Sequence, residues 1–362
     1  MTEATWEEYA AAGVASANSL GNRGPVRLDN DGHLLPEILD AYRRIGFYVF
    51  TGVLDDEELR ELTGEFDALL DNAPTASGGD TDQHGRPSLF GGYFTMMEDE
   101  DDPDAPARVY LLSHPFIYME STLRLYAHPK ILAIAESLYG PDFVPFHEAI
   151  FYKAPHDGLP TRWHQDGRTH WTDEGVSLEQ PDGSGMCHGY NMSVALSHCT
   201  ADNCLWVVPG SHRNWLKADG GRFPPITERL PDAVPVLLAP GDCGIVSRSS
   251  LHGSYPNRSA ERRVTVLLGF HHRDSAIGAS TTNVHAFKIP GAETKKITYT
   301  EDYVLRRTRM IPLAIDARRQ HRPDEIPFRY QGSFIGDSKW NESTRAEISR
   351  DGDEYWQRDI TL

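Results

Sequence analysis

Two short stretches decide how this sequence is interpreted: WHQDG at residues 163–167 and LHGS at residues 251–254. In the first, His164 and Asp166 are two residues apart, and on a β-strand side chains at this spacing point to the same face and can bind one metal ion. Two ligands do not make a stable site, and His252 in the second stretch is the candidate for the third. Two imidazoles and one carboxylate on one face of a metal ion leave its remaining positions open for chemistry.

The spacing of His164 and Asp166 can also arise by chance, because the chain holds 16 His and 53 Asp or Glu residues. A histidine followed two residues later by an acid occurs twice, in His164-Gln165-Asp166 and in His272-Arg273-Asp274. Only the first triplet is followed, at a distance that lets several strands intervene, by another histidine and then an arginine. We therefore interpret the second triplet as solvated surface. The first is a candidate metal site of the type found in non-haem Fe(II) oxygenases, and a chance spacing is the alternative.

The region from Phe143 to Phe270 is typical of an all-β sandwich or barrel, because short apolar runs alternate with Gly, Pro, Asp and Asn. The predicted strands are Glu148–Lys153, Arg162–Gln165, Met192–Leu196, Leu205–Val208, Gly244–Arg248 and Arg263–Phe270. An additional short strand, Phe47–Phe50, precedes this region. Helices are predicted at Trp6–Ala12, at Pro36–Arg44, after the acidic residues 55–58, and over Tyr118–Tyr139 with a break at Pro129.

An ordered set of motifs extends from residue 46 to residue 263. They are GFYVF at 46–50, LDDEEL at 54–59, YKAP at 152–155, WHQD at 163–166, NCLWVVPGSH at 203–212, and HGS at 252–254 with Asn257, Ser259 and Arg263. In this order they resemble the phytanoyl-CoA dioxygenase family of Fe(II)/2-oxoglutarate-dependent oxygenases. The resemblance implies a mostly β fold with helical additions, in which helices flank a double-stranded β-helix, a cupin-like jelly roll.

The same resemblance implies Fe(II) as cofactor, with 2-oxoglutarate and O2 as co-substrates. It assigns His164, Asp166 and His252 as the metal ligands and catalytic residues. Arg263, eleven residues after His252, is in the family's position for binding the far carboxylate of 2-oxoglutarate, which the guanidinium can hold through two hydrogen bonds. Ser254, Lys153 and Ser193 occupy positions of further co-substrate contacts, although the family often has tryptophan where this chain has Ser193.

The expected reaction is hydroxylation of an unactivated C–H bond in a small secondary-metabolite or lipid-like substrate, with conversion of 2-oxoglutarate to succinate and CO2. Desaturation, cyclisation and epoxidation use the same ligands and remain open. Related halogenases carry a small residue where this chain has Asp166, which disfavours halogenation. A cupin-like metal-binding protein without oxygenase activity is the alternative of another class. The candidate substrate contacts are Phe146, Arg168, His170, Trp171 and Tyr190.

The charge of the chain excludes some partners. A net charge of −18 repels phosphate backbones and anionic lipids, so neither nucleic acid nor a membrane is an expected partner. No apolar run is long enough for a membrane helix, which predicts a cytoplasmic protein. The four cysteines form no Cys-x-x-Cys pair and are interpreted as structural thiols. Monomer and homodimer both remain open.

We expect an N-terminal extension at 1–35, one oxygenase domain at 36–273, and a C-terminal extension at 274–362 packed on the same domain. Residues 71–106, with an acidic run at 98–104, read as a solvated loop that could act as a lid. The C-terminal extension is predicted to be the least constrained part of the chain. Its arginines between 306 and 322 are expected mainly to form salt bridges with the protein's own acids, and contact with an anionic substrate group is the alternative.

Overall fold

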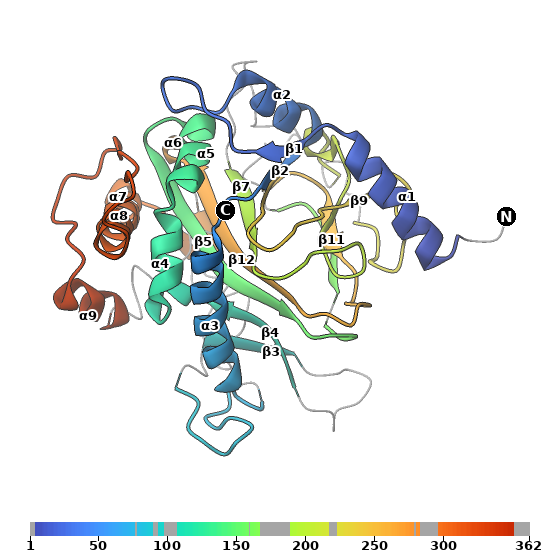
Figure 1. Cartoon of the computed structure of the whole chain (residues 1–362), viewed down its shortest axis with the longest axis horizontal. Coiled ribbons are helices and arrows are strands. Elements are labelled where there is room, and N and C mark those ends of the chain that lie inside the picture. The colour runs from blue at the N-terminus through green and yellow to red at the C-terminus, as the bar shows by residue number, and fades with distance from the viewer. Residues whose placement is uncertain are drawn as a thin grey trace. The chain divides into compact units, whose positions relative to one another are not determined.

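The protein is described here from a computed structural model covering residues 4–76, 78–89, 93–97, 107–158, 160–166, 189–216, 223–278, 280–282 and 296–350. By its internal contacts the chain divides into two compact units (Figure 1). The first unit comprises Met1–Leu54 and Tyr152–Val266, and the second comprises Asp55–Phe151 and Leu267–Leu362. All predicted metal ligands and co-substrate contacts belong to the first unit.

The first unit is built on two β-sheets. The larger contains, in spatial order, β1 (Arg23–Pro25), β2 (Phe47–Thr51), β10 (Cys243–Ser247), β7 (Gly189–Ala195) and the beginning of β12 (Arg263–His272). The smaller contains β6 (Thr161–His164), β11 (His252–Ser254), β8 (Trp206–Val207) and β9 (Val234–Pro235). The strands predicted around residues 47, 162, 192, 205, 244 and 263 are thus all present. The η4 turn Ser211–Arg213 follows β8.

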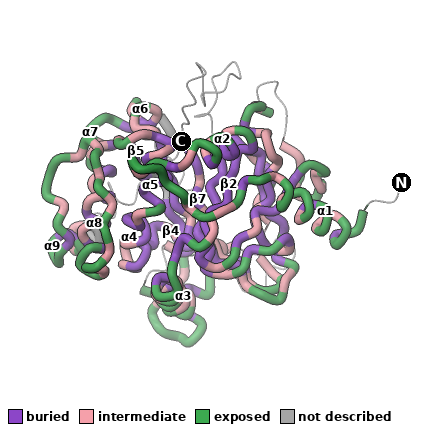
Figure 2. The backbone as a smooth tube through the Cα atoms, turned by 45° about the horizontal axis from the view of Figure 1, so that its top comes forward, coloured by how far each residue is buried: buried purple, intermediate pink, exposed green. Residues whose placement is uncertain are grey.

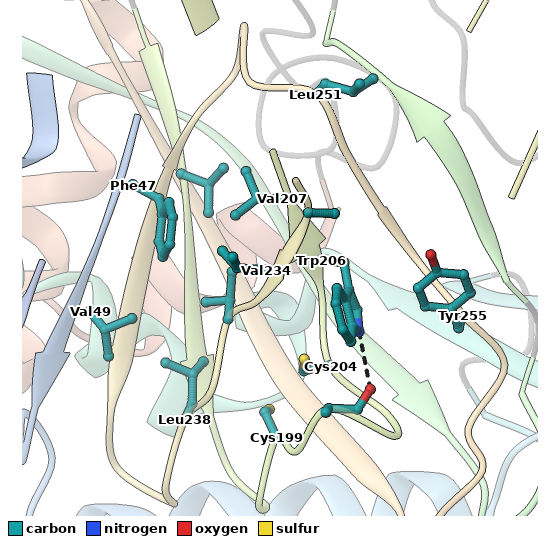
Figure 3. Packing of buried hydrophobic residues seen from close by; sticks show 14 of the residues in the cluster. Phe47, Val49, Cys199, Cys204, Trp206, Val207, Val234, Leu238, Leu251 and Tyr255 are labelled. Atoms are coloured by element: carbon teal, nitrogen blue, oxygen red, sulfur yellow. Dashed lines mark hydrogen bonds between the residues drawn. The ribbon is translucent and has the colours of Figure 1, made fainter. Parts of the chain in front are cut away.

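One hydrophobic core takes side chains from both of these sheets (Figure 3). Phe47 and Val49 extend from β2, while Trp206 and Val207 extend from β8 and Val234 from β9, all at most 2% exposed. Each such side chain contributes about 1.5–3 kcal/mol when fully removed from water. This core therefore fixes the spacing of the two sheets and, with it, the position of the strands that carry the metal ligands.

Helix α1 (Trp6–Ser19) covers the small sheet. It begins with a capping box, in which the side chains of Thr5 and Glu8 bond each other's backbone N–H groups. Tyr9 stacks on Trp206 with ring centroids 4.8 Å apart, and Trp6 meets Tyr255 edge-on at 4.9 Å. The helix predicted at Trp6–Ala12 is confirmed, and it continues for seven residues further because Ala, Gly and Val allow close packing on β9.

Helix α2 (Pro36–Ile45) confirms the helix predicted at Pro36–Arg44, extends it by one residue and ends at Gly46. This glycine has a φ of 89°, a left-handed conformation that favours glycine. A Cβ atom at this position would lie 2.4 Å from the His212 ring and 2.8 Å from the Ser250 hydroxyl. The turn between α2 and β2 is therefore packed closely against the segment that leads into β11.

The second unit combines strands with most of the helices. Its strands are β3 (Phe94–Met97), β4 (Arg108–Ser113), β5 (Phe143–Lys153), which continues into the first unit, the end of β12, and the pair β13 (Ser280–Thr282) and β14 (Lys296–Thr298). Its helices are α3 (Asp56–Asp71), η2 (Pro115–Ile117), α4 (Glu120–Tyr126), α5 (Pro129–Tyr139), α6 (Arg273–Ala276), α7 (Glu301–Thr308), α8 (Met310–His321) and α9 (Glu342–Arg350). Within the described residues, no helix is both long and apolar enough to span a membrane.

Part of the region 71–106 is not the loop that the sequence predicts. Residues Phe94–Met97 form β3, in which Phe94 and Met96 are buried while Thr95 and Met97 are half-buried. The strand is short and stands among Gly, Asp and Pro, so the alternation of four residues gives too small a signal to detect. The acidic run at 98–104 lies outside the described residues.

The prediction that the C-terminal extension is the least constrained part is wrong for α7 and α8. Met310, Ile311 and Leu313 are fully buried, and α8 packs against α4 (Figure 2). Arg307 is fully buried and pairs with Glu148 at 2.6 Å, and Arg318 pairs with Glu58 at 2.6 Å. The expected salt bridges to the protein's own acids are confirmed for these two arginines.

The described cysteines are free and buried: Cys199, Cys204 and Cys243. Burial raises the pKa of the Cys199 thiol to about 11, so the thiol stays protonated at neutral pH. A protonated, buried thiol is unreactive, which fits the structural role predicted for these residues. Cys187 lies outside the described residues.

Candidate metal centre

The three predicted metal ligands come together at one end of the small sheet. Strands β6 and β11 pair antiparallel with His252 opposite His164, and the two imidazole centroids are 4.2 Å apart. Asp166 lies just beyond β6, and its carboxylate oxygens are 3.4 Å from His164 Nε2 and 3.9 Å from His252 Nε2. One ligand atom from each residue lies within 4.8 Å of the other two, which is a suitable arrangement for one metal ion.

Backbone carbonyls set the tautomer of both histidines. Nδ1 of His164 donates to the Arg162 carbonyl at 2.7 Å, and Nδ1 of His252 donates to the Ser250 carbonyl at 2.8 Å. A carbonyl oxygen can only accept, so the proton of each neutral ring is on Nδ1 and the Nε2 lone pair faces the cluster. Fixing the outer nitrogen in this way is the usual means by which proteins orient metal-binding histidines.

The charges of Asp166 and His252 also suit a metal ion. Burial lowers the pKa of His164, but the hydrogen bond and charge of Asp166 outweigh it and raise this pKa above its usual value, so a metal ion would compete with a proton there. Burial, followed by the nearby His164, lowers the pKa of His252 to about 4. Burial raises the pKa of Asp166, but Arg248 and the two histidines outweigh this effect and hold the pKa well below its usual range. At neutral pH the site therefore offers an ionised carboxylate and a neutral His252 imidazole. A divalent metal requires ligands in these protonation states.

Gln165 holds the segment between the two ligands in place. Its side chain is buried and donates through Nε2 to the carbonyls of Asn214 at 2.7 Å and Ser249 at 2.6 Å. Its Oε1 accepts from the Leu216 N–H at 3.1 Å. Three segments that are distant in sequence are thereby joined directly behind His164 and Asp166.

Two buried cations lie beyond His252 in the same unit. Lys153, 1% exposed, donates to the Ser254 hydroxyl at 2.9 Å and to the Tyr255 carbonyl at 2.5 Å. Arg263, 7% exposed, donates to the Asn203 carbonyl at 3.1 Å, and its buried Nε has no partner among the described residues. Burial, followed by the charge of Arg263, holds the pKa of Lys153 well below its usual range.

This cation pair is chemically incomplete. Buried charges in proteins are normally paired with opposite charges. Within the described part of the chain, neither Lys153 nor Arg263 forms an ion pair with a carboxylate. An incoming carboxylate would supply the missing charge and accept a hydrogen bond from Arg263 Nε. The residues present therefore fit the carboxylate of an incoming ligand.

The remaining residues predicted to contact co-substrate or substrate differ in burial and in the strand face they occupy. Ser254 lies next to Lys153, and Ser193 is half-buried on β7. Tyr190 is fully buried, and strand alternation places it on the opposite face of β7 from Ser193. The side chain of Phe146, and residues Arg168, His170 and Trp171, lie outside the described residues.

The sequence interpretation missed two residues at the centre, Asn191 and Arg248. Asn191 donates from Nδ2 to Asp166 Oδ2 at 2.6 Å, and Arg248 Nη1 donates to Asn191 Oδ1 at 3.2 Å. Asn191 is two residues before Ser193, so it shares the face of β7 on which a ligand contact was predicted. The two-residue spacing from Ser193 could have identified Asn191 as a further candidate on this face.

Two packed β-sheets with two histidines and one carboxylate at a strand end define a metal-binding protein of the jelly-roll class. The chain also matches the family model described as phytanoyl-CoA dioxygenase (PhyH) over residues 42–265. This match covers more than half of the chain. The protein belongs to the phytanoyl-CoA dioxygenase family, as the motifs predict.

Three similar proteins illustrate the relationship. Dioxygenase lolE1 of Epichloe uncinata is 30% identical over 142 residues, 39% of this chain and 50% of that protein, so the chain spans about half the length of this relative. Ectoine dioxygenase of Halomonas elongata is 25% identical over 287 residues, 71% of this chain and 76% of that protein. The crystal structure of EctD from S. alaskensis with 2-oxoglutarate and 5-hydroxyectoine is 21% identical, with a TM-score of 0.52 over 69% of this chain and 82% of that chain. The last similarity confirms the predicted fold class.

Proposed function

We propose that this protein is an Fe(II)/2-oxoglutarate-dependent dioxygenase that hydroxylates an unactivated C–H bond of a small molecule. One observation carries the proposal: a two-histidine, one-carboxylate metal centre lies in the same unit as two buried cations that no carboxylate of the described residues neutralises. A metal site alone would fit many proteins. The additional unfilled anion site fits a dicarboxylate co-substrate.

Each residue has a defined task in this proposal. His164, Asp166 and His252 hold Fe(II) on one face. Arg263 binds the far carboxylate of 2-oxoglutarate through its planar guanidinium, while Lys153 and Ser254 provide further hydrogen bonds and charge. When bound, iron and 2-oxoglutarate together supply the oxidising chemistry, in which O2 is consumed, succinate and CO2 are released, and one oxygen atom is transferred to the substrate.

The substrate class rests on the relatives and is part of the proposal. The named relatives are ectoine dioxygenase and the fungal dioxygenase lolE1. The name ectoine dioxygenase supports a small-molecule substrate, and its secondary-metabolite or lipid-like character is part of the proposal. Desaturation, cyclisation and epoxidation would use the same metal ligands and differ only in how the substrate is held. A cupin-like protein without oxygenase activity would have no use for buried Lys153 and Arg263.

The proposal is tested with the full-length protein, Fe(II) and 2-oxoglutarate in the absence of O2. We expect a visible absorbance change that requires both additions and is lost in His252→Ala. On exposure to O2, the wild-type protein should release succinate, even slowly without its true substrate. His198→Ala serves as the control, because His198 is an exposed histidine of the same unit. Absence of both signals in the wild type would overturn the proposal.

A further inference from the structure

The two oxygens of the Asp166 carboxylate have different surroundings. Oδ2 accepts a 2.6 Å hydrogen bond from Asn191 Nδ2, whereas Oδ1 faces His164 Nε2 at 3.4 Å. A hydrogen bond to an ionised carboxylate is about twice as strong as one between neutral groups. Oδ2 also lies 3.9 Å from His252 Nε2, but it already accepts the Asn191 hydrogen bond. Oδ1, nearer to an imidazole nitrogen and not bonded to Asn191, is the oxygen better placed to bind a metal ion.

Arg248 determines which way the Asn191 amide points. Its Nη1 donates to Asn191 Oδ1 at 3.2 Å, so the amide oxygen turns toward Arg248 and the NH2 group toward Asp166. The Arg248 backbone contacts the same segment, because its carbonyl accepts from the Asp166 N–H at 2.8 Å. Arg248 is 6% exposed. One residue thus holds Asp166 through its backbone and, by way of Asn191, through its side chain.

These contacts lead to a proposal that rests on the proposed function. We propose that Asn191 and Arg248 are positioning residues that restrict Asp166 to metal binding through Oδ1 alone. A carboxylate free to rotate could bind with both oxygens and occupy an additional position on the metal. If Oδ2 does not bind the metal, three positions stay open: two for a 2-oxo acid that binds through two of its oxygens, and one for O2.

The placement of Asn191 is difficult to explain by stability alone. On the same face of β7, the half-buried Ser193 follows Asn191, and Ala195 beyond it belongs to the hydrophobic core. Val246, the register partner of Asn191 on β10, belongs to that core as well. An apolar side chain at position 191 would extend that core. A polar amide here requires partners, and the ones it has are the metal carboxylate and Arg248.

The test measures metal binding rather than turnover. Co(II) is added to the full-length wild-type protein and to Asn191→Leu, Arg248→Met and the double variant, and both affinity and visible spectrum are recorded. Val194→Ala is the matched control, because Val194 is a buried residue on the opposite face of the same strand. We expect Asn191→Leu to weaken Co(II) binding by about 10- to 100-fold and to change the Co(II) spectrum, as a higher coordination number does.

Three results decide the outcome. If Arg248 acts through Asn191, the double variant should lose much less affinity than the product of the two single losses. An unchanged affinity and spectrum in Asn191→Leu, or the same spectral change in Val194→Ala, would overturn the positioning role while leaving the proposed function intact. If the wild-type protein itself binds no Co(II), and His252→Ala behaves identically, both proposals are wrong.

Discussion

At the scale of single residues, the proposed metal ligands are the most exacting positions, because the described part of the chain brings only three such side chains together here. We predict that His164→Ala, Asp166→Ala or His252→Ala abolishes iron-dependent turnover and leaves a folded protein. The measurement is bound iron per protein after desalting, alongside thermal unfolding. Each variant should retain a cooperative unfolding transition. Normal iron content and turnover in any one of them would remove that residue from the ligand set.

Arg263 is the residue whose loss should act on the co-substrate alone. We predict that Arg263→Ala raises the KM for 2-oxoglutarate far more than the KM for the primary substrate. Losing one charged partner of a buried carboxylate costs about 2–5 kcal/mol, which corresponds to about 30-fold or more in affinity. Arg262→Ala is the control, since Arg262 is the half-exposed neighbour. A larger effect in Arg262→Ala would show that the wrong arginine has been assigned.

At the scale of elements, the turn between α2 and β2 contacts the residue that orients the His252 imidazole. Gly46 packs against Ser250, whose carbonyl accepts from His252 Nδ1. We predict that Gly46→Ala lowers the free energy of unfolding by about 1–3 kcal/mol and also weakens metal binding. Gly52 is the matched control: it too has a positive φ, of 60°, but a Cβ there would meet nothing within 4 Å. Gly52→Ala should therefore cost stability without affecting the metal.

The stability that the Glu58–Arg318 ion pair between α3 and α8 contributes should depend on pH. Burial raises the pKa of Glu58, but His128 and Arg318 outweigh it and lower the pKa to about 2 from 4.5. Since the folded-state pKa is the lower one, the contribution to stability is complete above pH 4.5 and is lost as pH falls from there toward 2. We predict that Glu58→Gln loses about 2 kcal/mol at neutral pH, and that its stability falls less than that of the wild type on acidification. Urea unfolding at a series of pH values measures both. Parallel pH profiles would contradict the assignment.

At the scale of the whole molecule, the C-terminal segment contributes structure to the second unit. A truncation at residue 290 removes α7 and α8, and with them Arg307, the buried partner of Glu148. Glu148 would keep its contacts with His114 and Tyr126 but lose its buried arginine. Breaking a buried ion pair costs about 3–5 kcal/mol, to which the loss of Met310 and Leu313 from the core is added. We predict that the truncated protein loses the cooperative unfolding of this unit and becomes sensitive to proteolysis. A stable, protease-resistant truncated protein would contradict this. Closure of residues 71–106 over the substrate stays a prediction.

The sequence by itself indicated the fold class, the starts of helices α1 and α2, and the pairing of two candidate metal ligands, because these depend on local rules. Alternation along a strand pairs His164 with Asp166, and the need for a left-handed residue ends α2 at Gly46. Only the tertiary structure decided the residues that act through distant partners. Lys153 meets Ser254 across 101 residues of sequence, and Arg307 finds Glu148 across 159. Asn191 is, in the sequence, one more polar residue on a strand. Its role depends on which strand lies opposite, and that is set by the packing of the two sheets around their shared core, which no local pattern encodes.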